Sequence, residues 1–163
     1  MLIKVKNKDT LILDDFIFQC VVGKKGTSRK KIEGDLCTPR GVFDLKTVYY
    51  RSDRIQKIQT KLTLKKIKKN MGWCNDPLSK KYNTQIEINE KVKHERLYRK
   101  DSKYDILLVI NYNLKKPIPF KGSAIFLHIT KNLKGTAGCI ALSKKDLLIL
   151  LKLINKKTKI EIF

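Results

Sequence analysis

The chain has 163 residues, of which 42% are hydrophobic, and its formal net charge is +22. This length suits a single domain with a sizeable core, and the hydrophobic content argues against disorder. The charge would attract a polyanion, yet the lysines are scattered along the sequence instead of gathering with arginines on one helix, which argues against a reader of a nucleic-acid groove. We therefore predict one globular domain over residues 1–163.

Cysteine spacing and hydropathy argue against two further classes. The cysteines, Cys20, Cys37, Cys74 and Cys139, form no C-x-x-C pair, and the chain has only two histidines, so we expect no structural zinc site. The spacing leaves the formation of disulfides open. Residues 1–7 lack the apolar core of a signal peptide, and no run of eighteen apolar residues occurs. We therefore expect no membrane span and no export signal of the usual kind.

The first part of the chain has the pattern of β-structure. Residues 2–6 alternate between apolar and polar side chains, and residues 10–22 contain further apolar runs, which predicts a β-hairpin or meander. Turn formers dominate residues 33–41, and residues 42–50 return to the β-branched and aromatic side chains of a strand. For residues 51–70 the pattern is ambiguous, and we predict a loop with a short helix.

The middle of the chain is predicted to supply the centre of a sheet. Residues 72–77 are rich in turn formers. Residues 104–111 and 124–129 are nearly continuous apolar runs, as in strands that are buried on both faces, and the first should lie in mid-sheet.

The C-terminal part is predicted to contain a helix and a last strand. Ser143 and Asp146 fit a capping box ahead of leucines at helical spacing, which predicts a helix over residues 144–153. Residues 158–163 alternate like a half-buried strand. The fold class that follows for the whole chain is mainly β, with one or two short helices.

A histidine and a cysteine point to catalysis. His128 ends an apolar run, and Cys139 follows eleven residues later, after the residues Thr-Ala-Gly. A thiolate is a strong nucleophile, and an imidazole within hydrogen-bond reach can take the thiol proton and later return it to an amine. A lone cysteine is more often a small buried hydrophobe, and this is our interpretation of Cys20. The neighbouring histidine makes Cys139 the candidate nucleophile.

Four segments carry a resemblance to a known family: residues 33–43, 72–77, 104–113 and 122–139. The last is the most specific, because it combines a histidine on a strand with a Thr-Ala-Gly-Cys elbow. On these motifs the chain resembles the L,D-transpeptidase catalytic domain (YkuD-like) family, from about residue 23 to the C-terminus. The resemblance implies a β-sandwich-like catalytic domain that requires no metal and no organic cofactor.

The resemblance also implies a reaction and the residues that perform it. In the family, the cysteine attacks the amide between the third and fourth residues of a peptidoglycan stem peptide, and an amine of another stem, or water, resolves the thioester. By position, Cys139 is the nucleophile, His128 the general base and acid, and the Ile129 carbonyl orients the imidazole. The backbone N–H groups of Gly138 and Cys139 are expected to form the oxyanion hole. Membership would place the protein, expected to be a monomer, in the cell envelope.

The chain departs from the better-known members of the family in two places. Those members have an arginine two residues after the cysteine, where this chain has Ala141. Arg99 and Arg40 are candidates to replace it, because an arginine pairs with a carboxylate through two parallel hydrogen bonds. The separation of His128 and Cys139 is also shorter, which predicts a different acceptor side of the site.

Further residues are candidates for substrate contact. Trp73 and Tyr82 lie in loop-like segments, where an exposed ring would stack on sugar or peptide, although plain packing explains them nearly as well. His94 lies among charged residues and is a rival base or a substrate-contacting residue. Thr136 is expected to hydrogen-bond within the elbow and to lie beside the substrate.

Three functions follow from these features. The leading hypothesis is an L,D-transpeptidase that forms a thioester. A hydrolytic relative, either an L,D-carboxypeptidase or a peptidase that cleaves crosslinks, uses the same residues. The third is a non-catalytic basic module that binds anionic wall polymer or nucleic acid through its lysines, with an affinity that falls steeply with salt.

Overall fold

The computed structural model describes residues 1–88 and 91–163. The large sheet consists of β1 (Leu2–Lys6), β2 (Thr10–Leu13), β3 (Phe16–Val21), β6 (Gly41–Tyr50), β7 (Leu64–Lys66), β11 (Ile106–Ile110), β12 (Phe126–Ile129), β13 (Ile140–Leu142) and β14 (Lys159–Ile162). A second sheet contains β8 (Met71–Cys74), β9 (Gln85–Glu87) and β10 (His94–Arg96), and β4 (Thr27–Ser28) pairs with β5 (Thr38–Pro39). The helix α1 spans Lys144–Leu153. This confirms the predicted mainly β fold with a short helix.

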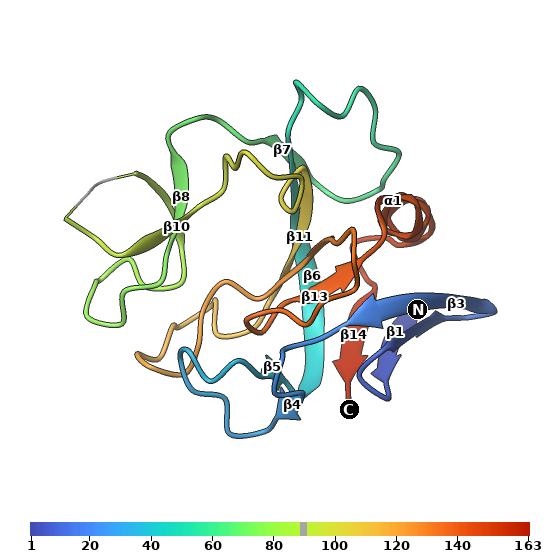
Figure 1. The fold of residues 1–163 in the computed structure, drawn as a ribbon, viewed down its shortest axis with the longest axis horizontal. Coiled ribbons are helices and arrows are strands. Elements are labelled where there is room, and N and C mark those ends of the chain that lie inside the picture. The colour runs from blue at the N-terminus through green and yellow to red at the C-terminus, as the bar shows by residue number, and fades with distance from the viewer. Residues whose placement is uncertain (89–90) are drawn as a thin grey trace.

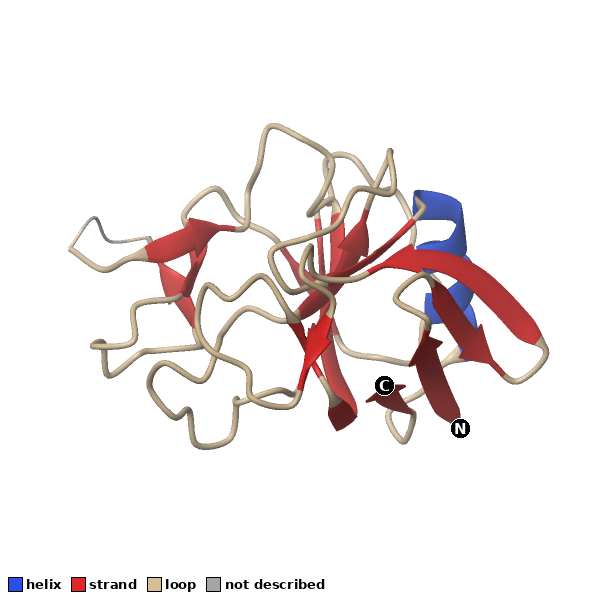
Figure 2. Ribbon diagram, turned by 60° about the horizontal axis from the view of Figure 1, so that its bottom comes forward, coloured by secondary structure: helices blue, strands red, loops and turns tan. Residues whose placement is uncertain are grey.

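The large sheet closes on itself. Its strands follow the order β11-β12-β13-β3-β2-β1-β14-β6, and β6 pairs again with β11, so that a barrel-like ring results. The pairs β1–β14 and β12–β13 are parallel. In Figure 1, α1 lies on one side of this ring and the sheet of β8 and β10 lies on the other. The two chain ends lie near each other (Figure 2), because the first and last strands, β1 and β14, are short and pair side by side.

Alternating side chains fill both faces of the central strands. Along β11, Ile106, Leu108 and Ile110 point into an aliphatic cluster inside the ring, whereas Leu107 and Val109 join a second cluster outside it. All five are buried, because an apolar layer covers each face of the strand. The strand pairs with β12 and β6, which confirms its predicted place in mid-sheet.

The helix α1 has the predicted bounds and the predicted cap. The Ser143 hydroxyl accepts a hydrogen bond from the Asp146 N–H at 3.1 Å, which satisfies a free donor of the first turn. Leu147, Leu150 and Leu151 are buried and pack into the aliphatic cluster. The helix therefore contributes to the ring's interior from one side.

Two predictions for the middle of the chain are wrong. Residues 51–70 contain no helix but the short strand β7, which extends the large sheet beside β6. Residues 72–77 are not all turn, because Met71–Cys74 is a strand in which all four residues are buried. Trp73 explains the difference: its ring packs edge-on against Tyr49 and Phe126, at 6.3 and 5.0 Å between centroids, and fixes this strand over the outer face of the ring.

Candidate active site

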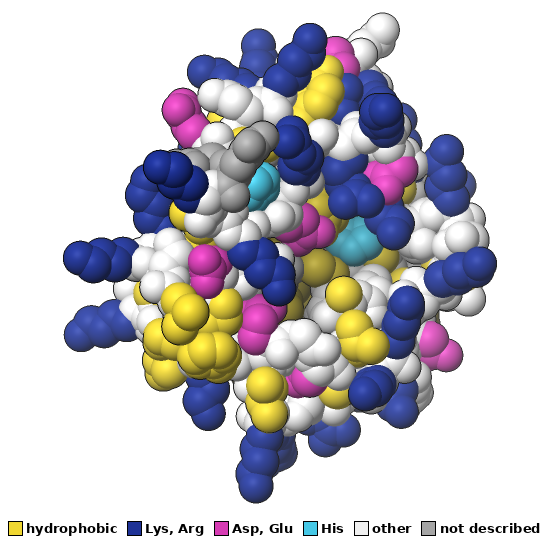
Figure 3. All heavy atoms as spheres, turned by 60° about the vertical axis from the view of Figure 1, so that its left-hand side comes forward, with side chains coloured by type: hydrophobic (Ala, Val, Ile, Leu, Met, Phe, Trp, Pro, Cys, Tyr) yellow, Lys and Arg dark blue, Asp and Glu magenta, His cyan; other side chains and the backbone are white. Residues whose placement is uncertain are grey.

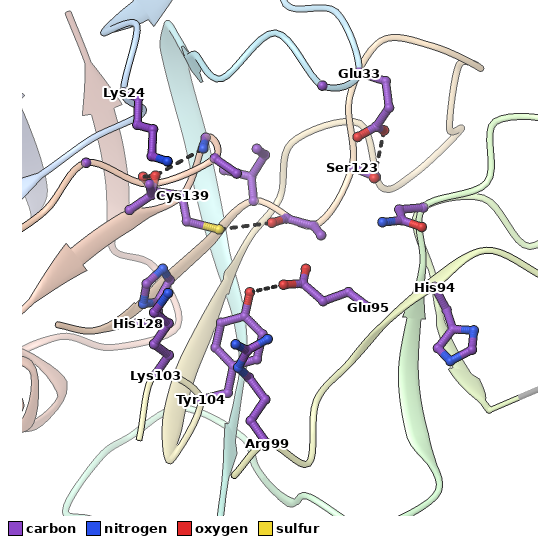
Figure 4. A pocket seen from close by; sticks show the side chains of 18 of the residues that line it. Lys24, Glu33, His94, Glu95, Arg99, Lys103, Tyr104, Ser123, His128 and Cys139 are labelled. Carbon is purple, nitrogen blue, oxygen red and sulfur yellow. Dashed lines mark hydrogen bonds between the residues drawn. The ribbon is translucent and has the colours of Figure 1, made fainter. Parts of the chain in front are cut away.

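The register of two parallel strands brings His128 and Cys139 to one face of the sheet. His128 on β12 lies opposite Ala141 on β13. Cys139 precedes Ala141 by two residues, and side chains two apart on an extended chain share a face. Accordingly, the Cys139 sulfur accepts the N–H of Phe126, two residues before His128, at 3.4 Å. Figure 4 shows the sulfur and the imidazole on the same wall of a pocket.

The imidazole of His128 is held in one tautomer. Its Nδ1 lies 2.9 Å from the Ile129 carbonyl oxygen, and because a carbonyl can only accept, Nδ1 carries the proton and Nε2 holds the lone pair. The side chain is 6% exposed. Burial, together with the nearby charges of Lys103 and Arg99, lowers the pKa of His128 to about 4. The ring is therefore a neutral base at pH 7.

The thiol of Cys139 is also neutral in the free protein. It donates a hydrogen bond to the Ala124 carbonyl oxygen at 3.1 Å, and the residue is 8% exposed. Burial, and after it the negative charge of Glu95, raises the pKa of Cys139 to about 12. The site thus holds a neutral thiol and a neutral imidazole, and not the preformed thiolate that a reactive cysteine would suggest.

The elbow before Cys139 is locked by its own hydrogen bonds. The Thr136 hydroxyl donates to the Cys139 carbonyl at 2.6 Å and accepts the Gly138 N–H at 3.0 Å. Gly138 has a φ of 143°, and a side chain there would meet the carbonyl oxygen of Cys37 at 2.9 Å. The predicted hydrogen bonding of Thr136 within the elbow is confirmed. Of the two N–H groups of the predicted oxyanion hole, that of Gly138 is therefore already engaged by Thr136. The Cys139 N–H is the other member of the pair.

A buried asparagine supports the carbonyl that faces the thiol. Asn83 accepts the N–H groups of Ala124, at 3.0 Å, and of the Trp73 indole, at 2.9 Å. Its amide donates to the carbonyls of Tyr112 and Asn113. Ala124 has a φ of 53°, a region that costs energy for a residue other than glycine. Asn83, in the turn between β8 and β9, thus ties Ala124 to Trp73 and to residues 112–113, and so fixes the carbonyl that accepts from the thiol.

His128 and Cys139 lie in a cleft of about 730 Å³ that is open to solvent. Figure 3 shows basic side chains around a hollow on this face of the molecule. Its charged lining consists of six cations and two carboxylates: Lys24, Lys31, Lys93, Arg99, Lys103, Lys134, Glu33 and Glu95. The cleft is therefore suited to substrates that carry carboxylates.

The two carboxylates are held by hydroxyl groups. Glu95 accepts the phenol of Tyr104 at 2.6 Å, and the Tyr104 ring packs edge-on against His128 at 5.4 Å between centroids. Glu33 accepts the hydroxyls of Tyr82 and Ser123 through a single oxygen. Burial raises the pKa of both Glu95 and Tyr104. Glu95 is thus linked to the imidazole through one aromatic ring.

The structure brings only some of the predicted residues into the cleft. His94 and Arg99 line it, together with Thr136 and Gly138. Figure 4 places His94 on the far side of the pocket from Cys139, so its position does not support the rival base. The guanidinium of Arg99 is paired with Asp101 through two hydrogen bonds, at 2.9 and 2.6 Å.

Three candidates for substrate contact, Trp73, Tyr82 and Arg40, do not line the cleft. Trp73 and Tyr82 are 4% and 3% exposed, and both rings belong to the buried interior. The Tyr82 hydroxyl reaches the cleft only indirectly, by donating to Glu33. Arg40 lines a different cleft beside the C-terminal residue Phe163, and it donates to Thr27 there. None of the three is available for stacking or carboxylate binding at Cys139.

Reasoning from the sequence missed the acidic and aromatic groups of the cleft. Glu95 and Tyr104 come from β10 and from the residues before β11, and Glu33 comes from a loop near the N-terminus. A signal for Glu33 existed, because the Glu-Gly-Asp segment is part of the family resemblance. Glu95 gave no comparable signal, since a glutamate between a histidine and an arginine is typical of an exposed surface segment.

Three further features concern disulfides, membrane spans and metal sites. The four cysteines are free. Within residues 1–88 and 91–163, no helix is long and apolar enough to cross a bilayer. The same part of the chain contains no group of three or more metal-ligating side chains.

Comparison with known proteins places the chain in a family. Residues 2–162 match the family described as L,D-transpeptidase catalytic domain, YkuD. A search of curated proteins gave no match. Among solved structures, the helical cell shape determining protein Pgp2 from Campylobacter jejuni is similar, with 18% identity, a TM-score of 0.53, and coverage of 99% of this chain and 46% of Pgp2. Bd1075 from Bdellovibrio bacteriovorus has 18% identity and a TM-score of 0.49, with 99% and 47% of the two chains covered.

The likeness to Pgp2 supports the fold, and this chain spans about half (46%) of that protein's length. The family match covers nearly the whole chain, including both His128 and Cys139. The protein belongs to the L,D-transpeptidase catalytic domain (YkuD) family.

Proposed function

We propose that the protein is a cysteine-dependent acyl transferase that acts on peptidoglycan stem peptides of the cell envelope through a thioester. One observation carries the proposal. Cys139 and His128 lie on the same face of adjacent parallel strands, inside one open cleft, and the Ile129 carbonyl leaves the imidazole lone pair on Nε2. A thiol and a base presented in this way are the two groups that acyl transfer requires.

The neutral pair dictates the order of proton movements. As the Cys139 sulfur attacks the scissile carbonyl carbon, its proton passes to Nε2 of His128, so that no free thiolate has to form before the attack. His128 then gives the proton to the departing amine, and the thioester remains. In the second half, an incoming amine gives its proton to His128 and forms the new amide. The C–S bond breaks, and the sulfur recovers the proton.

The backbone around Cys139 supplies the stabilisation of the oxyanion. The Cys139 N–H is the proposed donor, and the Gly138 N–H joins only if the Thr136 hydroxyl releases it. Removing one such donor typically costs on the order of 3 kcal/mol of transition-state stabilisation. The locked elbow would keep this donor in place before the substrate arrives.

The cationic rim favours a substrate with several carboxylates, as a stem peptide has. Lys24, Lys103 and Lys134 line the cleft with Arg99. The Arg99 guanidinium lies 5.3 Å from the centroid of the Tyr104 ring, and that ring packs against His128. We propose that Arg99 takes the role of the arginine that the better-known members have at the position of Ala141. Water in place of the amine would make the same site a carboxypeptidase or crosslink-cleaving peptidase.

The experiment is incubation of purified muropeptides with the protein, followed by mass spectrometry of the products. Wild type is expected to give a new crosslink or a shortened stem, and the two products differ in mass. Cys139→Ala should abolish both, whereas Cys37→Ala, which changes a partly exposed thiol outside the cleft, should leave both unchanged. Equal processing by Cys139→Ala and wild type would overturn the proposal, whereas no processing by either protein would favour a non-catalytic basic module.

A further inference from the structure

Four large hydrophobic side chains are exposed on loops beside the cleft. Ile32, Leu78, Ile118 and Phe120 are 60%, 85%, 57% and 55% exposed, and we call these four residues the loop edge. None of them lines the cleft of Cys139. Figure 3 shows hydrophobic side chains gathered on the surface next to the hollow. A group of apolar side chains left in water on a folded protein commonly marks a binding surface.

Hydrogen bonds join the three loops of the loop edge into one surface. The Phe120 carbonyl accepts the Glu33 N–H at 2.8 Å, one residue away from Ile32. The Tyr82 hydroxyl, from the third loop, accepts the Gly122 N–H at 3.0 Å and donates to Glu33. Glu33 also lines the cleft. The loop edge therefore adjoins the cleft and is fixed relative to it.

The loop between Asn113 and Gly122 is held in one shape that keeps its apolar side chains in water. The Asn113 side chain accepts the Ile118 N–H at 2.8 Å and donates to the carbonyls of Ile118 and Gly122 at 3.1 and 2.9 Å. Prolines on both sides of Ile118 restrict the backbone further. Phe120 has a φ of 64°, in the left-handed region that is unfavourable for a bulky residue. Such strain persists mainly at functional positions, and here it accompanies an exposed aromatic ring.

Lysines surround the loop edge. Residues 113–123 include three of them and no acidic residue. A soluble polyanion would bind lysines but leave the apolar side chains in water. The surface of an anionic bilayer satisfies both, because it offers phosphates to the lysines and the boundary of the acyl chains to the apolar groups. The exposed lysines on the three loops are Lys30, Lys80, Lys81, Lys115, Lys116 and Lys121.

We propose that the loop edge binds the surface of an anionic lipid bilayer, with its apolar side chains at the headgroup boundary and its lysines on the lipid phosphates. Because Glu33 belongs both to these loops and to the lining of the cleft, binding holds the cleft of Cys139 beside the membrane. This inference goes beyond the proposed function and does not depend on it.

The test is cosedimentation of the protein with lipid vesicles at low ionic strength. Wild type should bind vesicles of phosphatidylcholine with about one third phosphatidylglycerol, and should bind pure phosphatidylcholine much more weakly. Phe120→Ser should weaken binding about tenfold, because the apolar ring is lost. Phe120→Trp should bind as tightly as wild type, since tryptophan favours the membrane interface. Lys115→Gln, Lys116→Gln and Lys121→Gln together should weaken binding about a hundredfold, at about fivefold for each lysine.

Matched variants elsewhere on the molecule separate the loop edge from general hydrophobicity and charge. Ile17→Ser removes a side chain that is 73% exposed on β3, and it should leave binding unchanged. Lys144→Gln, Lys145→Gln and Lys152→Gln together remove the same charge from α1, and they should weaken binding no more than about threefold, because salt screens distant charges. Figure 1 places β3 and α1 across the ring from β8. The midpoint of urea unfolding should stay close to that of wild type in every variant, since each replaced side chain is exposed.

Three results would overturn the inference. One is wild type that binds anionic and neutral vesicles equally or binds neither. Another is Phe120→Ser that binds anionic vesicles as tightly as wild type, because adsorption would then depend on charge alone. The third is an equal loss from the lysines of α1 and those of the loop edge. Phe120→Ser should process soluble muropeptides as wild type does, so failure of membrane binding would leave the proposed acyl transfer intact.

Discussion

The two apolar clusters of the molecule differ in chemistry. The cluster inside the ring is almost entirely aliphatic, with Leu11 and Leu108 among its fully buried members. The cluster outside the ring is built around aromatic residues, including Trp73, Tyr104 and Phe126, and it contains Cys139. Aromatic side chains with a hydroxyl or an indole N–H can pack and still direct a polar group. The inner cluster therefore holds the strands together, and the outer one also orients the site.

One strand shows how the two clusters are kept apart. On β12, Leu127 points into the ring, whereas Phe126 and His128 point outward to the aromatic cluster and the cleft. Successive side chains of such a strand point to opposite faces, so substitutions at neighbouring positions should affect stability and chemistry in turn. The comparison predicts that substitutions inside the ring affect unfolding, and that substitutions outside it affect the reaction.

The largest expected effect is on the reaction. His128→Gln should lower kcat for muropeptide processing about a thousandfold, because the proton acceptor of the thiol is lost. The midpoint of urea unfolding at pH 7 should stay close to that of wild type. His94→Gln, on the far side of the cleft, is the control and should keep kcat within a few fold. A His128 variant with normal kcat would contradict the claim that side chains outside the ring control the reaction.

The next effect is on stability. Leu11→Ala inside the ring should lower the free energy of unfolding by roughly 4 kcal/mol, because it removes a fully buried side chain and leaves a cavity. Urea denaturation measures this loss. Turnover per folded molecule should match wild type within about twofold, provided that such distant sites act independently. A fall in kcat of the folded protein would show that the ring interior controls the site directly.

The smallest expected effect is on how the free energy of unfolding depends on pH. Burial lowers the pKa of His128 to about 4, from an ordinary 6.5 in the unfolded chain. Between these values the unfolded chain binds a proton that the folded protein does not. The contribution of His128 is thus fully present above pH 6.5 and is lost as pH falls towards 4, by about 3 kcal/mol in total.

The measurement is urea unfolding of wild type and His128→Gln between pH 7 and pH 4. Other acidic groups also titrate at low pH, so the difference between the two proteins isolates the histidine. Wild type should lose more stability than the variant over this range. Parallel curves would mean that the imidazole is not held neutral by its surroundings.

The sequence predicted those parts of the fold that local patterns determine. The helix over Lys144–Leu153 was predicted with its correct bounds, since Ser143 caps it and leucines recur at helical spacing. The strand Ile106–Ile110 was evident from its unbroken apolar run. The second sheet was missed, because its short strands contain glycine, charged and polar residues. Their pairing depends on contacts that Trp73 makes with distant strands, which no local pattern encodes.

The candidate site divides in the same way. Cys139, His128 and the Ile129 carbonyl could be predicted, because they lie close together in sequence and match a family motif. For Trp73 the sequence left substrate stacking and plain packing open, because it did not reveal that Asn83 satisfies the indole N–H. Glu95 approaches from the second sheet, so its role depended on the same long-range pairing.

The most direct test of the central claim is to trap the acyl-enzyme. The protein is mixed with a stem-peptide donor, quenched in acid, digested and analysed by mass spectrometry. The account predicts that the peptide containing Cys139 gains the mass of the donor acyl group, and that a competing amine or base removes it. Turnover of the donor with no adduct in Cys139-containing peptides, or with the adduct on another residue, would contradict the account.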